Sequence, residues 1–114
     1  MEGYGRLWDY DLNSRTLKKS QIPDEIIKKY LGGRGLAAYL MATYASIGVD
    51  PLSQENIIIF LSGPLTGTPA PGTGKYLVVS KSPATGAWLE SYSSGIFAVE
   101  MRYAGCDALI IRGK

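Results

Sequence analysis

Glycine, proline and small hydroxyl residues are concentrated in one stretch of the chain, SGPLTGTPAPGTGKY, at residues 62–76. It contains four glycines, three prolines and four serines or threonines, and it follows the apolar run IIIFL at residues 57–61. Glycine lets a backbone approach a ligand closely, and successive free amide groups attract anions. The stretch predicts either a site for a flat or anionic ligand or an ordinary long loop stiffened by its prolines.

A second glycine-rich segment, YLGGRGLAAYL, occupies residues 30–40. Glycines before a helix can bring amide groups close to a phosphate, although the segment lacks the G-x-G-x-x-G spacing of dinucleotide-binding turns. The alternative is a corner between two helices that needs a positive φ angle at Gly32 or Gly33. Such a corner requires no cation, so Arg34 within it is the unusual residue.

Several kinds of catalytic site are excluded within this chain. It has no histidine and a single cysteine, Cys106, so it cannot form a zinc site of histidines and cysteines, a Ser-His-Asp triad or an internal disulfide. Gly72–Lys75 does not form a P-loop, because the preceding spacing is absent and the segment runs into a strand. Cys106 is expected to be a small buried apolar residue, and Glu100, in a mainly apolar helix, is the carboxylate of most interest.

Size and charge place the chain in a broad class. Its 114 residues are expected to form one domain, and its net charge of +2 is scattered, which does not suggest nucleic acid as a partner. No apolar run approaches the roughly 20 residues that span a bilayer, and the N-terminus lacks the apolar core of a signal peptide. We therefore expect a soluble cytoplasmic protein with no membrane partner.

The periodicity of apolar residues predicts an α+β fold that would position these segments. Alternating residues predict a β-hairpin over residues 6–22, and residues 75–80 and 87–91 are expected to pair as a second hairpin. Ser93 or Ser94 is expected to cap the last helix, and Gly105 to end it. The remaining elements are helices over residues 24–31, 36–45 and 95–104, and strands over 57–61 and within 107–114.

Six blocks, taken in order, closely resemble the N-terminal domain of the aldehyde ferredoxin oxidoreductase family. They are YLGGRGLAAYL, GVDPLSQEN, SGPLTGTPAPGTGKY, VVSKSPATG, SSGIFAVEMRYAG and DALIIRGK. The resemblance covers essentially the whole chain, and its strength lies in order and spacing, above all GPLTGT-x-AP followed by KSP-x-TG. It implies a base of two β-sheets with short helices packed on them, of which residues 1–114 would be a truncated first part.

The resemblance also implies a cofactor and an activity. Family members are cytoplasmic enzymes that oxidise aldehydes to carboxylic acids and pass electrons through a [4Fe–4S] cluster to ferredoxin. Their metal is tungsten, or in some relatives molybdenum, held by the dithiolenes of two pyranopterins. The cluster cysteines, acid–base residues and substrate channel would lie outside this chain, so the 114 residues alone are expected to be inactive.

On this resemblance, residues 63–76 form the floor beneath the cofactor, with Thr66, Gly67 and Thr68 as contributors. Lys75 occupies the place of an arginine that contacts the pterin, which keeps a cation but loses its bidentate fork. Tyr92 stands where many relatives have an asparagine whose main-chain carbonyl helps to hold a Mg²⁺ ion between the two pterin phosphates. The other implied cofactor-binding residues are Arg34, Gly74, Ser93, Ser94 and Gly95.

Two alternatives to the enzyme stay open at this point. The first is a binding or assembly module that keeps the fold without redox chemistry, because two positions near the phosphates depart from the family pattern. The second is a small nucleotide-phosphate binder that uses the glycine-rich loops, although no complete phosphate motif is present. An open edge of a truncated sheet could also pair with a second copy to form a homodimer.

Overall fold

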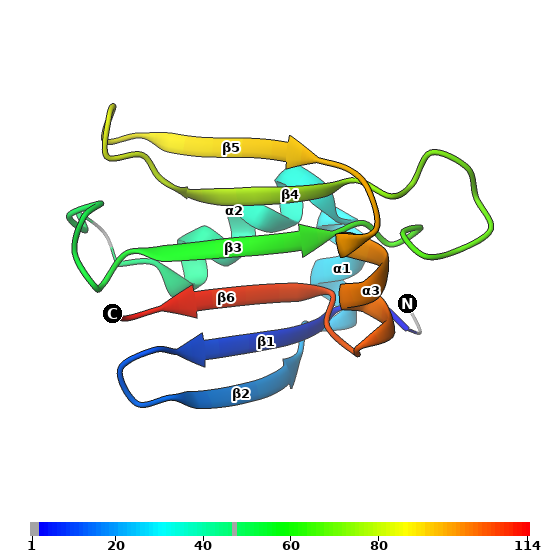
Figure 1. Ribbon diagram of the computed structural model, residues 1–114, viewed down its shortest axis with the longest axis horizontal. Coiled ribbons are helices and arrows are strands. Elements are labelled where there is room, and N and C mark those ends of the chain that lie inside the picture. Colours follow the sequence, from blue (N-terminus) through cyan, green and yellow to red (C-terminus); the bar gives the residue numbers. More distant parts are fainter. Residues whose placement is uncertain (1–2, 47) are drawn as a thin grey trace.

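The computed structural model describes residues 3–46 and 48–114 and confirms the predicted α+β fold. One mixed sheet contains all the strands of the described residues, where the resemblance implied two sheets for a whole domain. Three short helices pack on this sheet (Figure 1). The elements are β1 (Arg6–Asp11), β2 (Thr16–Gln21), α1 (Asp24–Tyr30), α2 (Gly33–Tyr44), β3 (Ile57–Ser62), β4 (Tyr76–Lys81), β5 (Trp88–Ser93), α3 (Phe97–Tyr103) and β6 (Ala108–Arg112).

The strand order in the sheet is β2-β1-β6-β3-β4-β5. Both predicted hairpins are confirmed, because β1 pairs antiparallel with β2, and β4 with β5. The last strand, β6, lies in the middle of the sheet, parallel to β1 and antiparallel to β3 (Figure 1). The two ends of the chain are therefore joined through adjacent strands, and β6 connects the two hairpin halves of the sheet.

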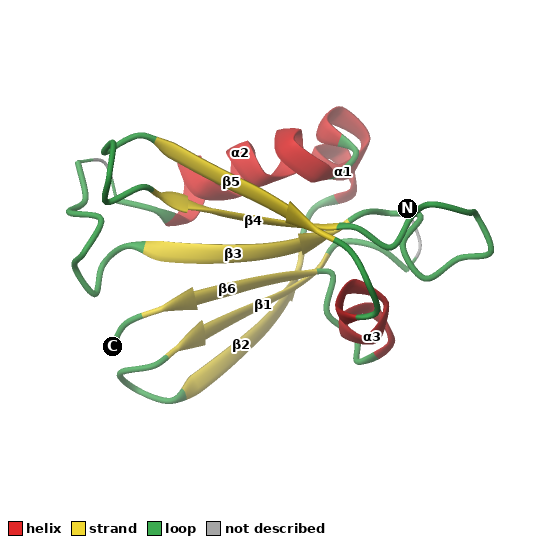
Figure 2. Ribbon diagram, turned by 45° about the horizontal axis from the view of Figure 1, so that its top comes forward, coloured by secondary structure: helices red, strands yellow, loops and turns green. Residues whose placement is uncertain are grey.

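The helices α1 and α2 cover one face of the sheet, whereas α3 lies at one end on the other side (Figure 2). Alternate strand residues point toward α1 and α2 and form the core with them. The largest fully buried apolar side chains are Tyr4, Leu7, Ile27, Leu36, Leu40, Ile57, Ile59, Leu61, Leu77, Val79 and Ile110. None of the helices in residues 3–46 and 48–114 is long and apolar enough to cross a membrane.

The opposite face of the sheet is also rich in apolar side chains. Trp8, Phe60, Val78 and Leu109 alternate with the core residues of their strands and are half-buried. Near α3, Phe60 packs against Phe97 with ring centroids 6.0 Å apart. Away from α3, no described helix covers this face (Figure 2).

The corner between α1 and α2 has unusual backbone angles. Leu31 adopts φ 63° and ψ −69°, and the Gly32 amide donates to the Tyr30 carbonyl at 2.8 Å, which closes a γ-turn that is strained for a residue with a side chain. Gly32 is extended, and Gly33 has the positive φ angle of 59° that the corner interpretation required. Helix α2 begins at Gly33, so it includes Gly33–Gly35, which the predicted helix over 36–45 left out.

The predicted cap of α3 is wrong, although the helix itself is confirmed. Ser93 is the last residue of β5, where it pairs with Tyr76, and the N-cap position is Ile96 with no side-chain cap. The strand is longer than predicted because the ladder with β4 satisfies backbone groups up to Ser93, so neither serine reaches the cap position. Gly105 follows the helix with φ 98° and ends it as predicted.

Replacing Ile59 by alanine should lower the free energy of unfolding by about 2–5 kcal/mol, because Ile59 is fully buried in a central strand and the change leaves a cavity. Leu52→Ala is the matched control, since 82% of Leu52 is exposed and its loss should cost less than about 0.5 kcal/mol. Urea unfolding measures both. Equal losses for the two variants would contradict the assigned core.

Candidate functional site

Both glycine-rich segments lie at the same end of the sheet. The glycine–proline loop, residues 63–75, joins the end of β3 to the start of β4, and β5 ends beside it (Figure 1). The corner before α2 contacts the first turn of this loop, because a Cβ atom on Gly32 would lie only 2.9 Å from Cδ of Pro64. Glycine is needed at position 32 for this close approach.

The glycine–proline loop is held in shape by its own hydroxyl groups. The buried hydroxyl of Thr66 accepts a hydrogen bond from the Gly63 amide at 3.1 Å and donates to the Thr73 carbonyl at 2.7 Å. The Thr68 hydroxyl donates to the Leu65 carbonyl at 2.6 Å. Thr66 thus ties the two arms of the loop together, whereas Thr68 is exposed. A pocket of about 130 Å³ lies between residues 66–68 and the side chains of Arg6, Arg102 and Tyr103.

The second arm of the loop approaches the end of β5. A Cβ atom on Gly74 would lie 3.2 Å from the carbonyl oxygen of Gly95, so the two backbones meet where glycine leaves room. The backbone amides of Gly72 and Gly74 have no acceptor among the described residues. Ser93 pairs with Tyr76, which directly follows Lys75. Five residues that the resemblance implied as cofactor-binding therefore lie close together: Gly74, Lys75, Ser93, Ser94 and Gly95. Lys75 is exposed and forms no ion pair with a described residue.

Arg34 and Tyr92 form a neighbouring pair on the side of the sheet that carries α2. The Arg34 Nε atom donates to Oε2 of Glu90 at 2.8 Å, with 66% of the Arg34 side chain exposed. The hydrogen bond and charge of Glu90, followed by the Tyr92 phenol, raise the pKa of Arg34. Arg34 therefore joins the start of α2 to β5, which gives the cation in the corner a structural partner.

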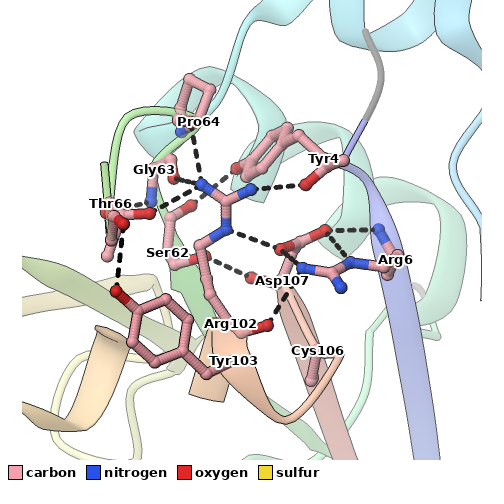
Figure 3. A network of polar contacts seen from close by, with 12 residues as sticks. Tyr4, Arg6, Ser62, Gly63, Pro64, Thr66, Arg102, Tyr103, Cys106 and Asp107 are labelled. Carbon is pink, nitrogen blue, oxygen red and sulfur yellow. Dashed lines mark hydrogen bonds and ion pairs between the residues drawn. The ribbon is translucent and has the colours of Figure 1, made fainter. Parts of the chain in front are cut away.

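A network of charged side chains around one buried carboxylate supports the loop from below (Figure 3). The Asp107 side chain is 1% exposed. It accepts hydrogen bonds from the Arg6 amide at 2.8 Å, from Arg6 Nε and Nη2 at 3.0 Å each, and from Arg102 Nε at 2.9 Å. The Asp107 carbonyl accepts from the amide and hydroxyl of Ser62, both at 3.0 Å. Asp107 thus connects β1 and α3 through its carboxylate, and the end of β3 through its main-chain carbonyl.

Sequence reasoning missed this network. Glu100, the carboxylate it singled out in α3, is exposed, whereas Arg102 of the same helix has only 11% of its side chain exposed. The available signal was weak: Asp107 is a charged residue between a helix-ending glycine and an apolar strand. Among the described residues, no three histidine, cysteine, aspartate or glutamate side chains are grouped to hold a metal ion.

The surroundings of Asp107 and Cys106 shift their pKa values in opposite directions. Burial alone would raise the pKa of Asp107, but hydrogen bonds from Arg6 and the charges of Arg102 and Arg6 outweigh burial and hold it below 3.8. Burial, with a smaller contribution from Asp107, raises the pKa of Cys106 to about 11. Cys106 is buried, as the sequence predicted.

Asp107→Asn should lower the free energy of unfolding at neutral pH by about 3–5 kcal/mol, because it leaves two guanidinium groups without their counter-charge. The folded pKa is depressed, so the carboxylate stabilises the fold above its ordinary pKa of 3.8, and this contribution is lost as the pH falls through the folded pKa. Urea unfolding at a series of pH values measures this. The difference in the free energy of unfolding between wild type and variant should shrink as the pH falls below 3.8.

Asp9→Asn is the control for this experiment. Asp9 forms a similar two-pronged ion pair with Arg112 at the other end of β6, but both side chains are partly exposed. Its loss should cost about 1 kcal/mol or less. A D107N variant as stable as D9N at neutral pH would contradict the role assigned to Asp107.

Comparison with known proteins agrees with this geometry. Residues 8–114 match the family model described as "Aldehyde ferredoxin oxidoreductase, N-terminal domain". The fold also superposes on a chain of the solved active site complex BamBC of benzoyl coenzyme A reductase in complex with 1,5-dienoyl-CoA, with a TM-score of 0.92 and 35% identity over 96% of this chain and 17% of that one. The fold and the loop cluster thus define an N-terminal domain of the kind found in large oxidoreductases.

Curated relatives make the family assignment specific. The chain is 45% identical over 111 residues to the tungsten-containing aldehyde ferredoxin oxidoreductase of Pyrococcus furiosus, and 42% identical over 111 residues to that of Thermococcus kodakarensis. Each match covers 97% of this chain and 18% of the relative, so the chain spans less than a fifth of their length. It belongs to the aldehyde ferredoxin oxidoreductase family.

Another relative is named for a different activity. The chain is 40% identical over 115 residues to the aliphatic sulfonate oxidoreductase, WOR-like subunit, of Pyrococcus furiosus, a match that covers 96% of this chain and 18% of the relative. Relatives named for different substrates therefore share this domain at similar identity. Similarity within this domain therefore does not by itself indicate a substrate.

Proposed function

We propose that this chain is the cofactor-binding floor of a tungsten or molybdenum bis-pyranopterin oxidoreductase. The observation that carries the proposal is the meeting of Gly74 and Gly95 beside an exposed lysine and two loop amides that have no acceptor among the described residues. A side chain at position 74 would fill the space against the Gly95 carbonyl, and the amides and the cation are suited to the phosphate of a pyranopterin. The residues present thus fit the group that the family name implies.

The proposed contacts follow from the placement of each residue. The amides of Gly72 and Gly74 would donate to a phosphate, and Lys75 would neutralise it as a point charge. Ser93, Ser94 and Gly95 would contact the cofactor from the end of β5. Since the hydroxyl, amide and carbonyl of Thr66 are all used by the loop and by Arg102, Thr66 would contribute by fixing the shape of the loop, with Gly67 and Thr68 beside it.

The remaining cofactor contacts concern β5 and the start of α2. The main-chain carbonyl of Tyr92 would be a ligand for a Mg²⁺ ion between the two pterin phosphates, because Mg²⁺ prefers oxygen ligands and the role needs no particular side chain. Arg34, held by Glu90, would lie close to the cofactor or beneath it.

For the whole protein we propose the oxidation of a small aldehyde to a carboxylic acid in the cytoplasm. When bound, the metal and its pterins would supply two-electron redox chemistry, with the electrons passing through a [4Fe–4S] cluster to ferredoxin. One cysteine cannot bind such a cluster, so its ligands would come from outside these 114 residues. The part of this chain would be to bind and orient the cofactor.

Lys75→Met in the full-length protein should lower the content of pterin and metal by about tenfold or more, since the phosphate loses its cation. Lys28→Met, on the exposed side of α1, is the matched control and should keep the wild-type content. Both proteins are purified without oxygen, and tungsten, molybdenum and oxidised pterin are measured per chain. A wild-type protein without metal and pterin would overturn the proposed function, and K75M with wild-type content would remove Lys75 from the site.

A further inference from the structure

The guanidinium group of Arg102 lies beneath the first turn of the glycine–proline loop. Its Nη1 atom donates to the carbonyl oxygens of Gly63, Pro64 and Thr66 at 3.3, 2.8 and 2.8 Å (Figure 3). Its Nη2 atom donates to the carbonyl of Gly3. One nearly buried cation from α3 therefore binds three of the four carbonyl groups of residues 63–66.

These hydrogen bonds fix the direction of the peptide groups in the loop. In a trans peptide the carbonyl and the following amide point in opposite directions, and the described residues contain no cis peptide. Because the carbonyls of Pro64 and Thr66 point toward Arg102, the amides of Leu65 and Gly67 point away from it. Neither amide is hydrogen-bonded to a described residue. Arg102 thus turns two free donors outward.

Arg102 is itself held by the Asp107 carboxylate, which two guanidinium groups share. The Nη2 atom of Arg6 also donates to the main-chain carbonyl of Arg102 at 3.1 Å. With two positive groups and one negative group, the cluster keeps an excess of one positive charge beneath the loop. Partly buried charges are screened less than exposed ones, so this excess favours an anionic group above the loop.

We infer that Arg102 is a positioning residue for the cofactor: by holding the carbonyls of Pro64 and Thr66, it presents the amides of Leu65 and Gly67 as donors to an anionic part of the pyranopterin. Asp107 keeps Arg102 in this place. The inference rests on the proposed function and names, beyond it, the side chain that orients the first arm of the loop.

The test compares wild-type full-length protein with R102M and R102K, all purified without oxygen. The measurements are pterin per folded chain and the rate at which folded protein releases pterin, followed by fluorescence after oxidation. R102M should release pterin at least tenfold faster than wild type. R102K should show an intermediate rate, because lysine keeps the charge and can donate to the carbonyls but lacks the fork that also binds Asp107.

Arg112→Met is the control for stability alone. Arg112 binds Asp9 through two hydrogen bonds of 2.9 Å, at the end of β6 remote from Asp107. R112M should keep the wild-type release rate even where its unfolding temperature falls. Partial rescue by R102K together with an unchanged rate in R112M separates positioning of the cofactor from general loosening of the fold.

The outcomes separate this inference from the function on which it rests. Folded R102M with a wild-type release rate would overturn the inference and leave the proposed function intact, as would equal acceleration in R112M. If R102M does not fold, the rate of pterin release from R102K tests the inference. A rate faster than wild type supports the inference, and a wild-type rate overturns it. A wild-type protein without pterin overturns the proposed function, and the inference falls with it.

Discussion

The rest of the structure depends on one buried carboxylate. Asp107 is almost inaccessible to solvent and lies between the guanidinium groups of Arg6 and Arg102. Through these partners and its own carbonyl, it joins β1, α3, the end of β3 and the glycine–proline loop. A carboxylate this far from water is stable only when it is paired and hydrogen-bonded, so the four segments take an arrangement that satisfies Asp107.

This constraint explains how a segment with so little side chain can form a defined surface. Glycines at positions 72 and 74 leave the backbone open to a ligand, but they also make the loop costly to order. The Thr66 hydroxyl bonds to the other arm of the loop, and Arg102 of α3 bonds to the loop carbonyls. These hydrogen bonds order the loop from its inner side and leave its outer side accessible. A preorganised backbone of this kind is what an oxidoreductase needs to hold a large anionic cofactor.

Local signals predicted most of the elements, and long-range contacts account for what was missed. Alternating residues identified both hairpins, and Gly105 correctly indicated the end of α3. The central position of β6 was not predictable from periodicity, because it depends on pairing with strands far away in sequence. The roles of Arg102 and Asp107 were not predicted for the same reason, because their partners come together only in the folded chain. The order of the sequence blocks, in contrast, was specific enough to indicate the family.

A crystal structure of the full-length protein, prepared without oxygen and with its metal located by anomalous scattering, tests the central claim most directly. The account predicts pyranopterin density over the glycine–proline loop, with a phosphate within hydrogen-bonding distance of the Gly74 amide and of Lys75. Density at the opposite end of the sheet, beside the ion pair of Asp9 and Arg112, would contradict it. So would density over the apolar face that carries Trp8 and Leu109.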